Sequence, residues 1–362
     1  MKIIFFIENL WTGGKERRLI ELIGFLKHHT DYEIALVLTE DGIHFEKVYE
    51  LGITIKIIKR RAINNDPTLF LKFFRYCRLF KPDIIHTWGI MTTFYAIPAK
   101  FICRVPLITS MIADLNIIFK RRSFINFIFN INLCFSDVIL SNSKAGLRAY
   151  QINSSKAKVI YNGVGHERFH QHFDTLKIRK EIGVKTDYMI IMVATFSKYK
   201  DYNLFVDVAK AIGKIRDDTT FIAIGDGIEW NHIQQRIKDE HINNILLTGK
   251  QKEVEPFIAA SDIGLLCTYS ESISNSIIEY MSLGKPVITN DTFGGSKELI
   301  KDGETGYIME GNANLIADKI DLLLNDLSLR NSMGEQGKNL IRTSFSVDRM
   351  GKEFIEVYEN LC

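Results

Sequence analysis

Residues 262–290 read DIGLLCTYSESISNSIIEYMSLGKPVITN, and this stretch decides the fold. Two short apolar runs, at 262–267 and 286–290, have the length and the β-branched content of buried strands. Between them, residues 274–284 repeat apolar side chains at helical spacing, and Ser274 is a suitable helix-capping residue. This order predicts two parallel strands joined by a crossover helix, the repeating unit of a sheet covered on both faces.

The same alternation continues outward in both directions. Further strands are expected in the C-terminal half at 188–194, 220–225 and 244–249, and in the N-terminal half at 2–7, 33–38, 53–58, 83–88, 106–110, 137–141 and 158–161. We therefore expect an α/β protein with two doubly wound parallel sheets, at residues 1–165 and 166–345. A C-terminal helix at 346–362 is expected to pack back on the first domain. Ligands of such sheets bind at the carboxyl ends of the strands, so residues there are the functional candidates.

Composition places the 362-residue chain among packed globular proteins, because 46% of its residues are hydrophobic and 25% are charged. The longest uncharged runs, 84–99 and 123–136, are shorter than the roughly 20 residues of a spanning helix. The opening MKIIFFIENL indicates a buried strand rather than a signal peptide. The five cysteines are far apart and form no C-x-x-C, so neither a disulfide framework nor a zinc site is expected, and a reducing cytoplasm fits.

Charge is divided unequally along the chain. Residues 1–165 contain 23 Lys and Arg against 13 Asp and Glu, a net +10, whereas the remainder contains 23 against 30, a net −7. A basic first half implies an anionic partner there: nucleic acid, a phosphate-bearing substrate or a membrane surface.

Two strand ends carry residues suited to phosphate. Gly13 and Gly14 follow the first strand and open a helix, where free amides can approach a phosphate or a sugar, although a plain tight turn has the same spacing. Lys198 and Lys200 follow the strand at 188–194 and can neutralise a diphosphate, or can be solvated loop lysines. No complete G-x-G-x-x-G occurs at the Gly13–Gly14 turn or at Gly225-Asp226-Gly227, which lacks the third glycine, and this disfavours a nicotinamide or flavin enzyme.

Two glutamates lie in and near the helix of the opening stretch. Glu271 lies in the loop before it and Glu279 lies inside it, and carboxylates accept hydrogen bonds from vicinal hydroxyls of a sugar or a ribose. Ser274, Asn275 and Ser276 at the helix start can cap it and offer amides to an anion. A capped helix with a solvated glutamate is the alternative.

Taken together, these motifs resemble those of retaining glycosyltransferases of the GT-B type, and more narrowly family 4, also called glycosyltransferase group 1. Glu271 and Glu279 match the E-x7-E motif of that family. Matches to its other motifs are GKPV at 284–287, GGSKE at 294–298, DGETG at 302–306, GGKER at 13–17, YNGV at 161–164 and GDG at 225–227. The resemblance covers essentially the whole chain.

The resemblance implies two Rossmann-like domains facing a central cleft, an acceptor-binding domain at 1–165 and a nucleotide-sugar-binding domain at 166–345. It implies that Glu271 contacts the donor sugar and that Lys200 contacts the diphosphate, the two candidate catalytic residues. It also implies a base-binding loop at 248–251 and a ribose contact from Glu279. The full set of implied donor-binding residues is Gly13, Gly14, Lys198, Lys200, Gly249, Glu271, Ser274, Asn275, Ser276 and Glu279.

The chain departs from the family pattern in three places. Thr195 stands where the family often has an arginine, so Lys198 is expected to take over its phosphate contact. The loop at 110–114 lacks the histidine that many members have there, and Ser272 replaces the glycine that usually follows the first glutamate. No D-x-D occurs in the chain. The expected mechanism therefore uses no metal and no cofactor: Lys200 and helix-end amides stabilise the leaving diphosphate of a UDP- or GDP-linked sugar.

Acceptor and membrane contacts are expected in the first domain. His86, at the end of a strand, and Asp114 are candidates for the acceptor side, and a strand-end histidine bonded to backbone is the alternative for His86. The segments 67–81 and 119–135 combine aromatic residues with cations, either as core-covering helices or as a surface for an anionic leaflet. For the second segment we favour membrane contact, with Lys120, Arg121 and Arg122 as the contacting cations.

The function expected from these observations is a metal-independent, retaining hexosyltransferase that builds cell-surface polysaccharide or lipopolysaccharide on a lipid-linked or saccharide acceptor. We expect it in the cytoplasm, as a peripheral protein on the cytoplasmic face of the inner membrane. A GT-B-fold epimerase or hydrolase of nucleotide sugars is the alternative. A nucleic-acid-binding protein is disfavoured, because no recognised binding motif occurs and the acidic half would be unexplained.

Overall fold

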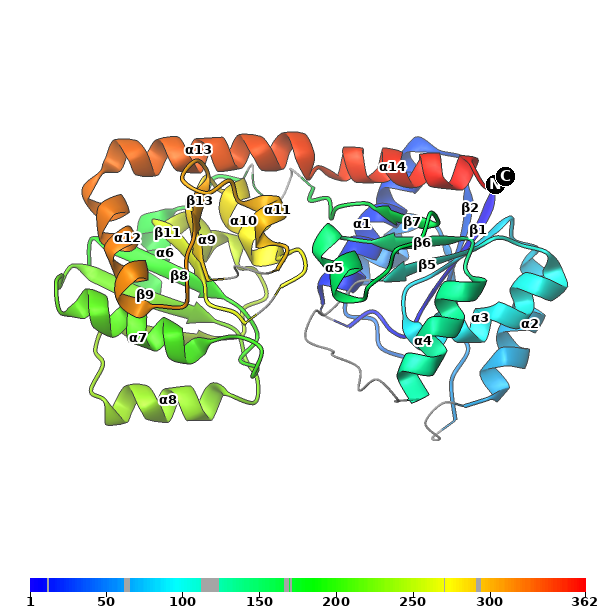
Figure 1. Cartoon of the computed structure of the whole chain (residues 1–362), viewed down its shortest axis with the longest axis horizontal. Coiled ribbons are helices and arrows are strands. Elements are labelled where there is room, and N and C mark those ends of the chain that lie inside the picture. The colour runs from blue at the N-terminus through cyan, green and yellow to red at the C-terminus, as the bar shows by residue number, and fades with distance from the viewer. Residues whose placement is uncertain are drawn as a thin grey trace. The chain divides into compact units, whose positions relative to one another are not determined.

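A computed structural model describes residues 1–11, 13–61, 66–111, 124–165, 169, 171–269, 271–290 and 294–362. These residues divide into two compact units (Figure 1). Unit 1 comprises Met1–Val164 together with Ser346–Cys362, and unit 2 comprises Gly165–Phe345. Each unit contains one fully parallel sheet, so the expected α/β fold class is confirmed.

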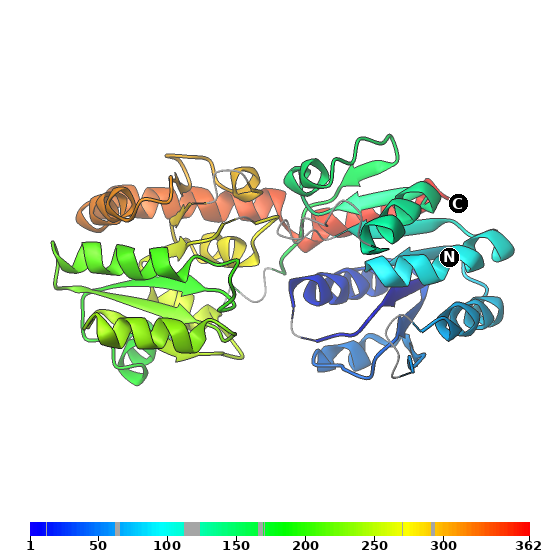
Figure 2. The ribbon, with the colours of Figure 1, turned by 60° about the horizontal axis from the view of Figure 1, so that its bottom comes forward.

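The sheet of unit 1 has seven strands in the order β3-β2-β1-β4-β5-β6-β7. The strands are β1 (Lys2–Ile7), β2 (Glu33–Leu38), β3 (Thr54–Ile57), β4 (Ile84–Thr87), β5 (Leu107–Met111), β6 (Val138–Ser141) and β7 (Ala157–Val159). Helices cover both faces (Figure 2): α1 (Gly14–His29), η1 (Glu46–Leu51), α2 (Thr68–Phe80), α3 (Ile90–Cys103), α4 (Phe124–Phe135), α5 (Lys144–Ala149) and α14 (Val347–Glu359).

Alternation along the strands of unit 1 creates one apolar cluster on each face of the sheet. In β1, Phe5 belongs to the cluster beneath α1 and α14, whereas Phe6 belongs to the one beneath α2 and α3. The C-terminal segment therefore lies in unit 1, where α14 packs against α1. The two helices approach so closely that a Cβ at Gly351 would clash with the ring of Phe25.

The sheet of unit 2 has six strands in the order β10-β9-β8-β11-β12-β13. The strands are β8 (Tyr188–Val193), β9 (Thr219–Ile224), β10 (Ile245–Gly249), β11 (Ile263–Leu266), β12 (Val287–Thr289) and β13 (Gly306–Ile308). The helices are α6 (Thr175–Glu181), α7 (Tyr202–Gly213), α8 (Trp230–Asp239), α9 (Glu255–Ala260), α10 (Asn275–Ser282), α11 (Ser296–Leu299), α12 (Ala313–Asn325) and α13 (Leu327–Ser344).

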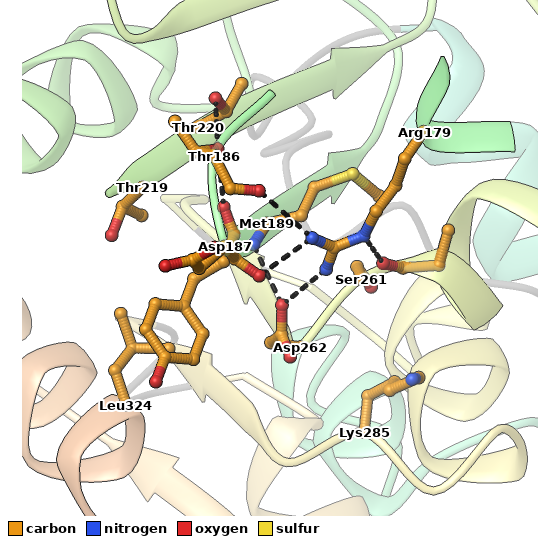
Figure 3. Close-up of polar contacts among 12 residues, drawn as sticks. Arg179, Thr186, Asp187, Met189, Thr219, Thr220, Ser261, Asp262, Lys285 and Leu324 are labelled. Atoms are coloured by element: carbon orange, nitrogen blue, oxygen red, sulfur yellow. Dashed lines mark hydrogen bonds and ion pairs between the residues drawn. The ribbon is translucent and has the colours of Figure 1, made fainter. Parts of the chain in front are cut away.

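Arg179 on α6 ties together the amino ends of β8 and β11 (Figure 3). Its guanidinium donates to the carboxylate of Asp262 at 2.8 Å and to the carbonyl of Asp187 at 2.8 Å. The same Asp262 oxygen accepts the N–H of Met189 at 2.9 Å. These bonds join the amino ends of β8 and β11, which pair in parallel, so their carboxyl ends lie side by side at the opposite edge of the sheet.

Within the part of the chain that the structure describes, no helix is both long enough and apolar enough to cross a bilayer.

Candidate functional site

The strand order of unit 2 reverses direction at β8. The chain runs outward from β8 to β9 and β10, then returns to pair β11 on the other side of β8 and continues to β12 and β13. At such a reversal the loops that follow the two central strands diverge and leave room for a ligand at their carboxyl ends. The candidate site of unit 2 is therefore expected where the chain leaves β8 and β11.

The structure brings two of the predicted residues together at this point. Lys200, in the loop after β8, forms an ion pair with Glu271, in the loop after β11. Their side chains are only 16% and 17% exposed, so water screens this pair less than a surface pair. The sequence placed both residues at strand ends, and the strand order makes those ends adjacent.

Backbone contacts fasten the two loops to each other. Lys200 forms an antiparallel bridge with Thr268, and the N–H of Asp201 donates to the carbonyl of Cys267 at 3.0 Å. The carbonyl of Tyr199 accepts from both the hydroxyl of Thr268 and the N–H of Tyr269, each at 3.2 Å. The ion pair therefore joins two segments whose backbones are already held together.

The GGSKE motif at 294–298 packs against the loop after β11 that carries Glu271. The N–H of Gly295 donates to the carbonyl of Glu271 at 2.8 Å. A Cβ at Gly295 would clash with the carbonyl of Ser272, so only glycine fits at this distance from the loop. This contact gives the GGSKE motif a structural reason: it positions Glu271.

Helix α10 is docked on the carboxyl end of β8 by both polar groups of Val193. The hydroxyl of Ser276 donates to the Val193 carbonyl at 2.6 Å, and the Val193 N–H donates to the hydroxyl of Tyr280 at 2.6 Å. Tyr280 is fully buried, and this burial raises the pKa of its hydroxyl. These bonds point the N-terminus of α10 at the same strand end that carries Lys200.

The expected side-chain cap of α10 is wrong. Ser274 does occupy the N-cap position, but its side chain makes no capping hydrogen bond to the helix. The Ser274 side chain therefore does not bond the first-turn amides, and the N-terminus of a helix favours an anion. The hydroxyl of Ser276 is committed to Val193, so its backbone amide is the group that Ser276 can offer.

Glu279 lies on α10 as the motif predicts, and it is only 4% exposed. Gly249 ends β10 with φ of +75°, a left-handed conformation that favours glycine, and its carbonyl accepts the N–H of Gly225 at 3.0 Å. Lys198 is exposed, and its ammonium lies 5.6 Å from the centre of the Tyr199 ring. Contacts of these residues with a donor stay predictions.

The GDG turn after β9 packs against the segment that leads to Lys200. Gly225 and Gly227 have φ of +150° and +147°, and a Cβ on them would clash with the carbonyls of Ala194 and Phe196. The N–H of Phe196 in turn donates to the carbonyl of Asp226 at 2.8 Å. The turn thus shapes the backbone between β8 and the lysine rather than presenting a reactive side chain.

Unit 1 has its own reversal of strand order, between β1 and β4, and it carries a charged cluster that sequence reasoning missed. Gly13 caps α1 and Gly14 begins it, and Lys15 pairs with Glu8 at 3.1 Å and with Glu16 at 3.6 Å. Burial lowers the pKa of Lys15, but the two carboxylates outweigh it and the pKa is raised. A Cβ at Gly89, after β4, would clash with the carboxylate of Glu8, so both strand ends shape this cluster.

The prediction that His86 contacts the acceptor is wrong. Rather than facing an acceptor, its imidazole is 0% exposed, with Nδ1 at 2.9 Å from the hydroxyl of Tyr358 and Nε2 at 2.7 Å from that of Ser110. Burial, and then the charge of Arg18, hold the pKa of His86 well below its usual value. Arg18 is itself buried, which lowers its pKa to about 9, and its guanidinium lies 5.3 Å from the centre of the Phe354 ring. The neutral His86 therefore helps to hold α14 in the core of unit 1.

The remaining candidates, Asp114, Lys120, Arg121 and Arg122, lie outside the described residues. Among the residues that are described, no three His, Cys, Asp or Glu side chains are grouped so as to hold a metal ion. A surface hollow beside Arg179 is lined by residues of the segment 176–187. It lies at the amino edge of unit 2, opposite the Lys200–Glu271 pair.

Comparison with known proteins accounts for nearly the whole chain. Residues 12–168 match the model of Glycosyltransferase Family 4, and residues 174–340 match that of Glycosyl transferases group 1. The N-acetyl-alpha-D-glucosaminyl L-malate synthase of Bacillus anthracis is 32% identical over 206 residues, which is 56% of this chain and 53% of that relative. The match therefore spans about half the length of that enzyme.

Two further proteins match over nearly their full length. The N-acetylgalactosamine-N,N'-diacetylbacillosaminyl-diphospho-undecaprenol 4-alpha-N-acetylgalactosaminyltransferase of Campylobacter jejuni is 25% identical over 93% of this chain and 94% of that relative. The crystal structure of HepE from Anabaena in complex with UDP and glucose superposes with a TM-score of 0.86 at 21% identity, over 99% of both chains.

The two family models, the motif residues around the Lys200–Glu271 pair and the shared GT-B fold agree, and the chain belongs to the family 4, or group 1, glycosyltransferases.

Proposed function

We propose that this glycosyltransferase moves a sugar from a UDP- or GDP-linked donor to a lipid-linked saccharide, with retention of configuration and without a metal ion. The Lys200–Glu271 pair at the strand reversal of unit 2 is the observation that carries this proposal. It places one cation and one carboxylate, both little exposed, beside the N-terminus of α10.

Each member of the pair matches one part of a nucleotide sugar. The ammonium of Lys200 and the amides at the start of α10 suit a diphosphate, because both present positive charge to the same strand end. The carboxylate of Glu271 suits vicinal sugar hydroxyls, which donate hydrogen bonds to it. When a donor binds, Lys200 exchanges Glu271 for phosphate oxygens and Glu271 exchanges Lys200 for hydroxyls. Glu279 on the same helix is then the proposed ribose contact.

The proposed reaction breaks the bond between the anomeric carbon and the diphosphate oxygen and forms one to the acceptor oxygen on the same face of the sugar. The acceptor hydroxyl gives its proton to an oxygen of the leaving diphosphate, so no protein nucleophile is required. Negative charge grows on that diphosphate as the bond breaks, and Lys200 with the α10 amides stabilises it. The protein therefore contributes positioning and electrostatic stabilisation.

The proposed acceptor class rests on relatives. Two Campylobacter jejuni relatives, which match over 93% and 99% of this chain, have names that specify undecaprenol-linked saccharides. A Staphylococcus aureus relative, 26% identical over 54% of this chain, is named for capsular polysaccharide biosynthesis. By analogy we propose a lipid-linked acceptor in cell-surface polysaccharide or lipopolysaccharide assembly, with the protein peripheral on the cytoplasmic face of the membrane.

A nucleotide-release assay tests the function. The purified protein is given a panel of UDP-, GDP- and ADP-sugars, with and without a membrane lipid extract. Transfer predicts release that depends on one donor and rises severalfold with the extract, together with a labelled sugar that moves into the lipid fraction. Release unaffected by the extract, with only free sugar formed, would identify a hydrolase and overturn the proposal. Lys200→Gln should abolish release in either case, which controls for a contaminating enzyme.

A further inference from the structure

Three helices of unit 1 form an apolar and basic surface. Helices α2, α3 and α4 lie side by side, with α3 contacting both neighbours (Figures 1 and 2). Their inward residues enter the core, whereas large apolar side chains on their outer sides are exposed to solvent. We call the latter, together with the exposed cations of the same helices, the three-helix surface; its exposed apolar members include Leu79, Phe101, Ile102, Phe124, Phe127 and Phe135.

Helix α4 shows the division most clearly. Ile128, Phe129 and Asn132 are buried toward the protein, and the amide of Asn132 donates to the carbonyl of Ile90 at 2.8 Å. On the other side, Phe124 and Phe127 are each 61% exposed. A helix normally turns polar residues to water, so aromatic rings on the outer side of α4 indicate a partner other than water.

The apolar side chains of α3 and α4 are continuous. The rings of Phe101 and Phe135 meet edge to face at 5.4 Å between centroids, although both are exposed. The ammonium of Lys100 lies 5.7 Å from the centre of the Phe101 ring and donates to the carbonyl of Phe135 at 2.7 Å. The two helix ends therefore form one patch rather than two isolated rings.

Helix α2 contributes positive charge to this surface, and its aromatic face packs into the core. Phe73 and Cys77 are buried in the cluster beneath α2, so the core-covering interpretation of that face is correct. Arg75 and Arg78 are exposed on the opposite side of the helix, beside Leu79. This arrangement gives α2 a cationic outer side with an apolar end.

The charge of the surface has one sign. Helices α2, α3 and α4 contain no Asp or Glu. The nearest aspartates in sequence are already engaged: Asp66 is buried, Asp83 accepts the N–H of Lys2 at 2.7 Å, and Asp137 pairs with Lys100 at 2.7 Å. Apolar rings among cations, without acidic side chains, match the acyl chains and the anionic headgroups of a membrane leaflet.

We propose that the three-helix surface docks this protein on an anionic lipid bilayer. A second copy of the chain is a poorer occupant, because a two-fold interface brings a patch against itself and would set Arg75 and Arg78 against the same cations. The inference rests on the proposed function only for its purpose, which is to bring a lipid-linked acceptor within reach. The docking itself requires neither donor nor acceptor.

Vesicle co-sedimentation tests the proposal with the full chain and no substrate. Wild-type protein should bind vesicles of phosphatidylcholine mixed with phosphatidylglycerol, and bind pure phosphatidylcholine much less. Arg75→Gln with Arg78→Gln should weaken binding to the mixed vesicles about thirtyfold, from roughly 1 kcal/mol for each cation, and added salt should shrink this difference. Phe127→Gln should weaken binding about tenfold, because one half-inserted aromatic ring is lost.

Matched variants in unit 2 provide the controls. Lys214→Gln with Lys238→Gln removes two exposed cations, and Leu176→Gln removes a leucine that is 79% exposed. Neither should change vesicle binding, and all variants should keep the wild-type midpoint of thermal unfolding. Equal loss of binding in the two double variants would show that net charge alone drives it and would overturn the proposal.

Two other results would also overturn it. The first is a concentration-dependent dimer that Phe127→Gln abolishes, without vesicle binding by the wild type. The second is binding of the wild type to mixed vesicles that is unchanged both in the Arg75→Gln, Arg78→Gln double variant and in Phe127→Gln. Donor-dependent sugar transfer in the nucleotide-release assay, with no vesicle binding, would reject the docking surface and leave the proposed function standing.

Discussion

Replacing Glu271 by glutamine separates the two roles that the ion pair assigns to it. The substitution keeps the size and one hydrogen-bond acceptor and removes the charge that pairs with Lys200. We expect turnover at saturating donor to fall roughly tenfold to a hundredfold, because a charge-assisted hydrogen bond to the sugar contributes about 1.5–3 kcal/mol. We expect the free nucleotide diphosphate to bind severalfold more tightly, because Lys200 no longer has to leave a carboxylate.

The low exposure of the pair sets these magnitudes. Side chains that are 16% and 17% exposed exclude much of the screening water, so removing one charge of the pair should have a larger effect than removing one from a surface pair, which contributes about 0–1 kcal/mol. Glu304 provides the matched control, because it pairs with Lys301 at 3.7 Å with side chains 60% and 62% exposed. Glu304→Gln should change neither quantity measurably.

Isothermal titration calorimetry measures the affinity for the nucleotide diphosphate, and the nucleotide-release assay measures turnover at saturating donor. If Glu271→Gln weakened nucleotide affinity tenfold while turnover at saturation stayed at the wild-type value, the roles derived from the pair would be refuted. Wild-type values of both would show that the pair takes no part in donor binding.

Three further predictions concern the donor site and the core of unit 1. Glu279→Ala should weaken nucleotide affinity by roughly tenfold or more and affect saturated turnover less, because a ribose contact acts in both the bound and the reacting state; the same titration checks this. Activity should persist in EDTA, and complete loss that Mg²⁺ or Mn²⁺ restores would contradict the metal-free mechanism. Because burial holds the pKa of His86 well below 6.5, unfolded chains bind the extra proton first. As the pH is lowered from about 6.5, the free energy of unfolding should therefore decrease, and this group should contribute up to about 1.4 kcal/mol per pH unit. Denaturant titrations at several pH values measure this slope, and His86→Gln should remove the part that comes from His86.

Local pattern was sufficient to predict most strands and helices, because their apolar periodicity is strong and their ends are marked by turn residues. The strand β13 was missed, since Gly306–Ile308 begins with a glycine and directly follows the turn-forming residues DGET, so no apolar run marks it. The cap of α10 was mispredicted because the residue type favours Ser274 there, whereas the side-chain geometry depends on the loop that Gly295 supports.

Contacts between distant segments account for the other differences. His86 was a candidate for the acceptor side, but its ring is bonded by Tyr358 and Ser110, which are 272 and 24 residues away in sequence. The Lys200–Glu271 pair depends on β8 and β11 being neighbours, and the order of strands cannot be inferred from the strands themselves. The cluster of Glu8 and Lys15 could have been noticed, since both flank the first glycine turn.

The placement of α14 in unit 1 affects the order in which the protein can fold during synthesis. Roughly 180 residues of unit 2 are translated between Val164 and Ser346, which takes about 10–40 s at typical ribosome speeds. Throughout that time, the face of unit 1 that later buries Met350, Phe354 and Tyr358 is open to water. Unit 2 is therefore the first unit that can complete its core, and the first unit to be synthesised is the last to be closed. A nascent chain that stalls within α13 would present this apolar face to chaperones.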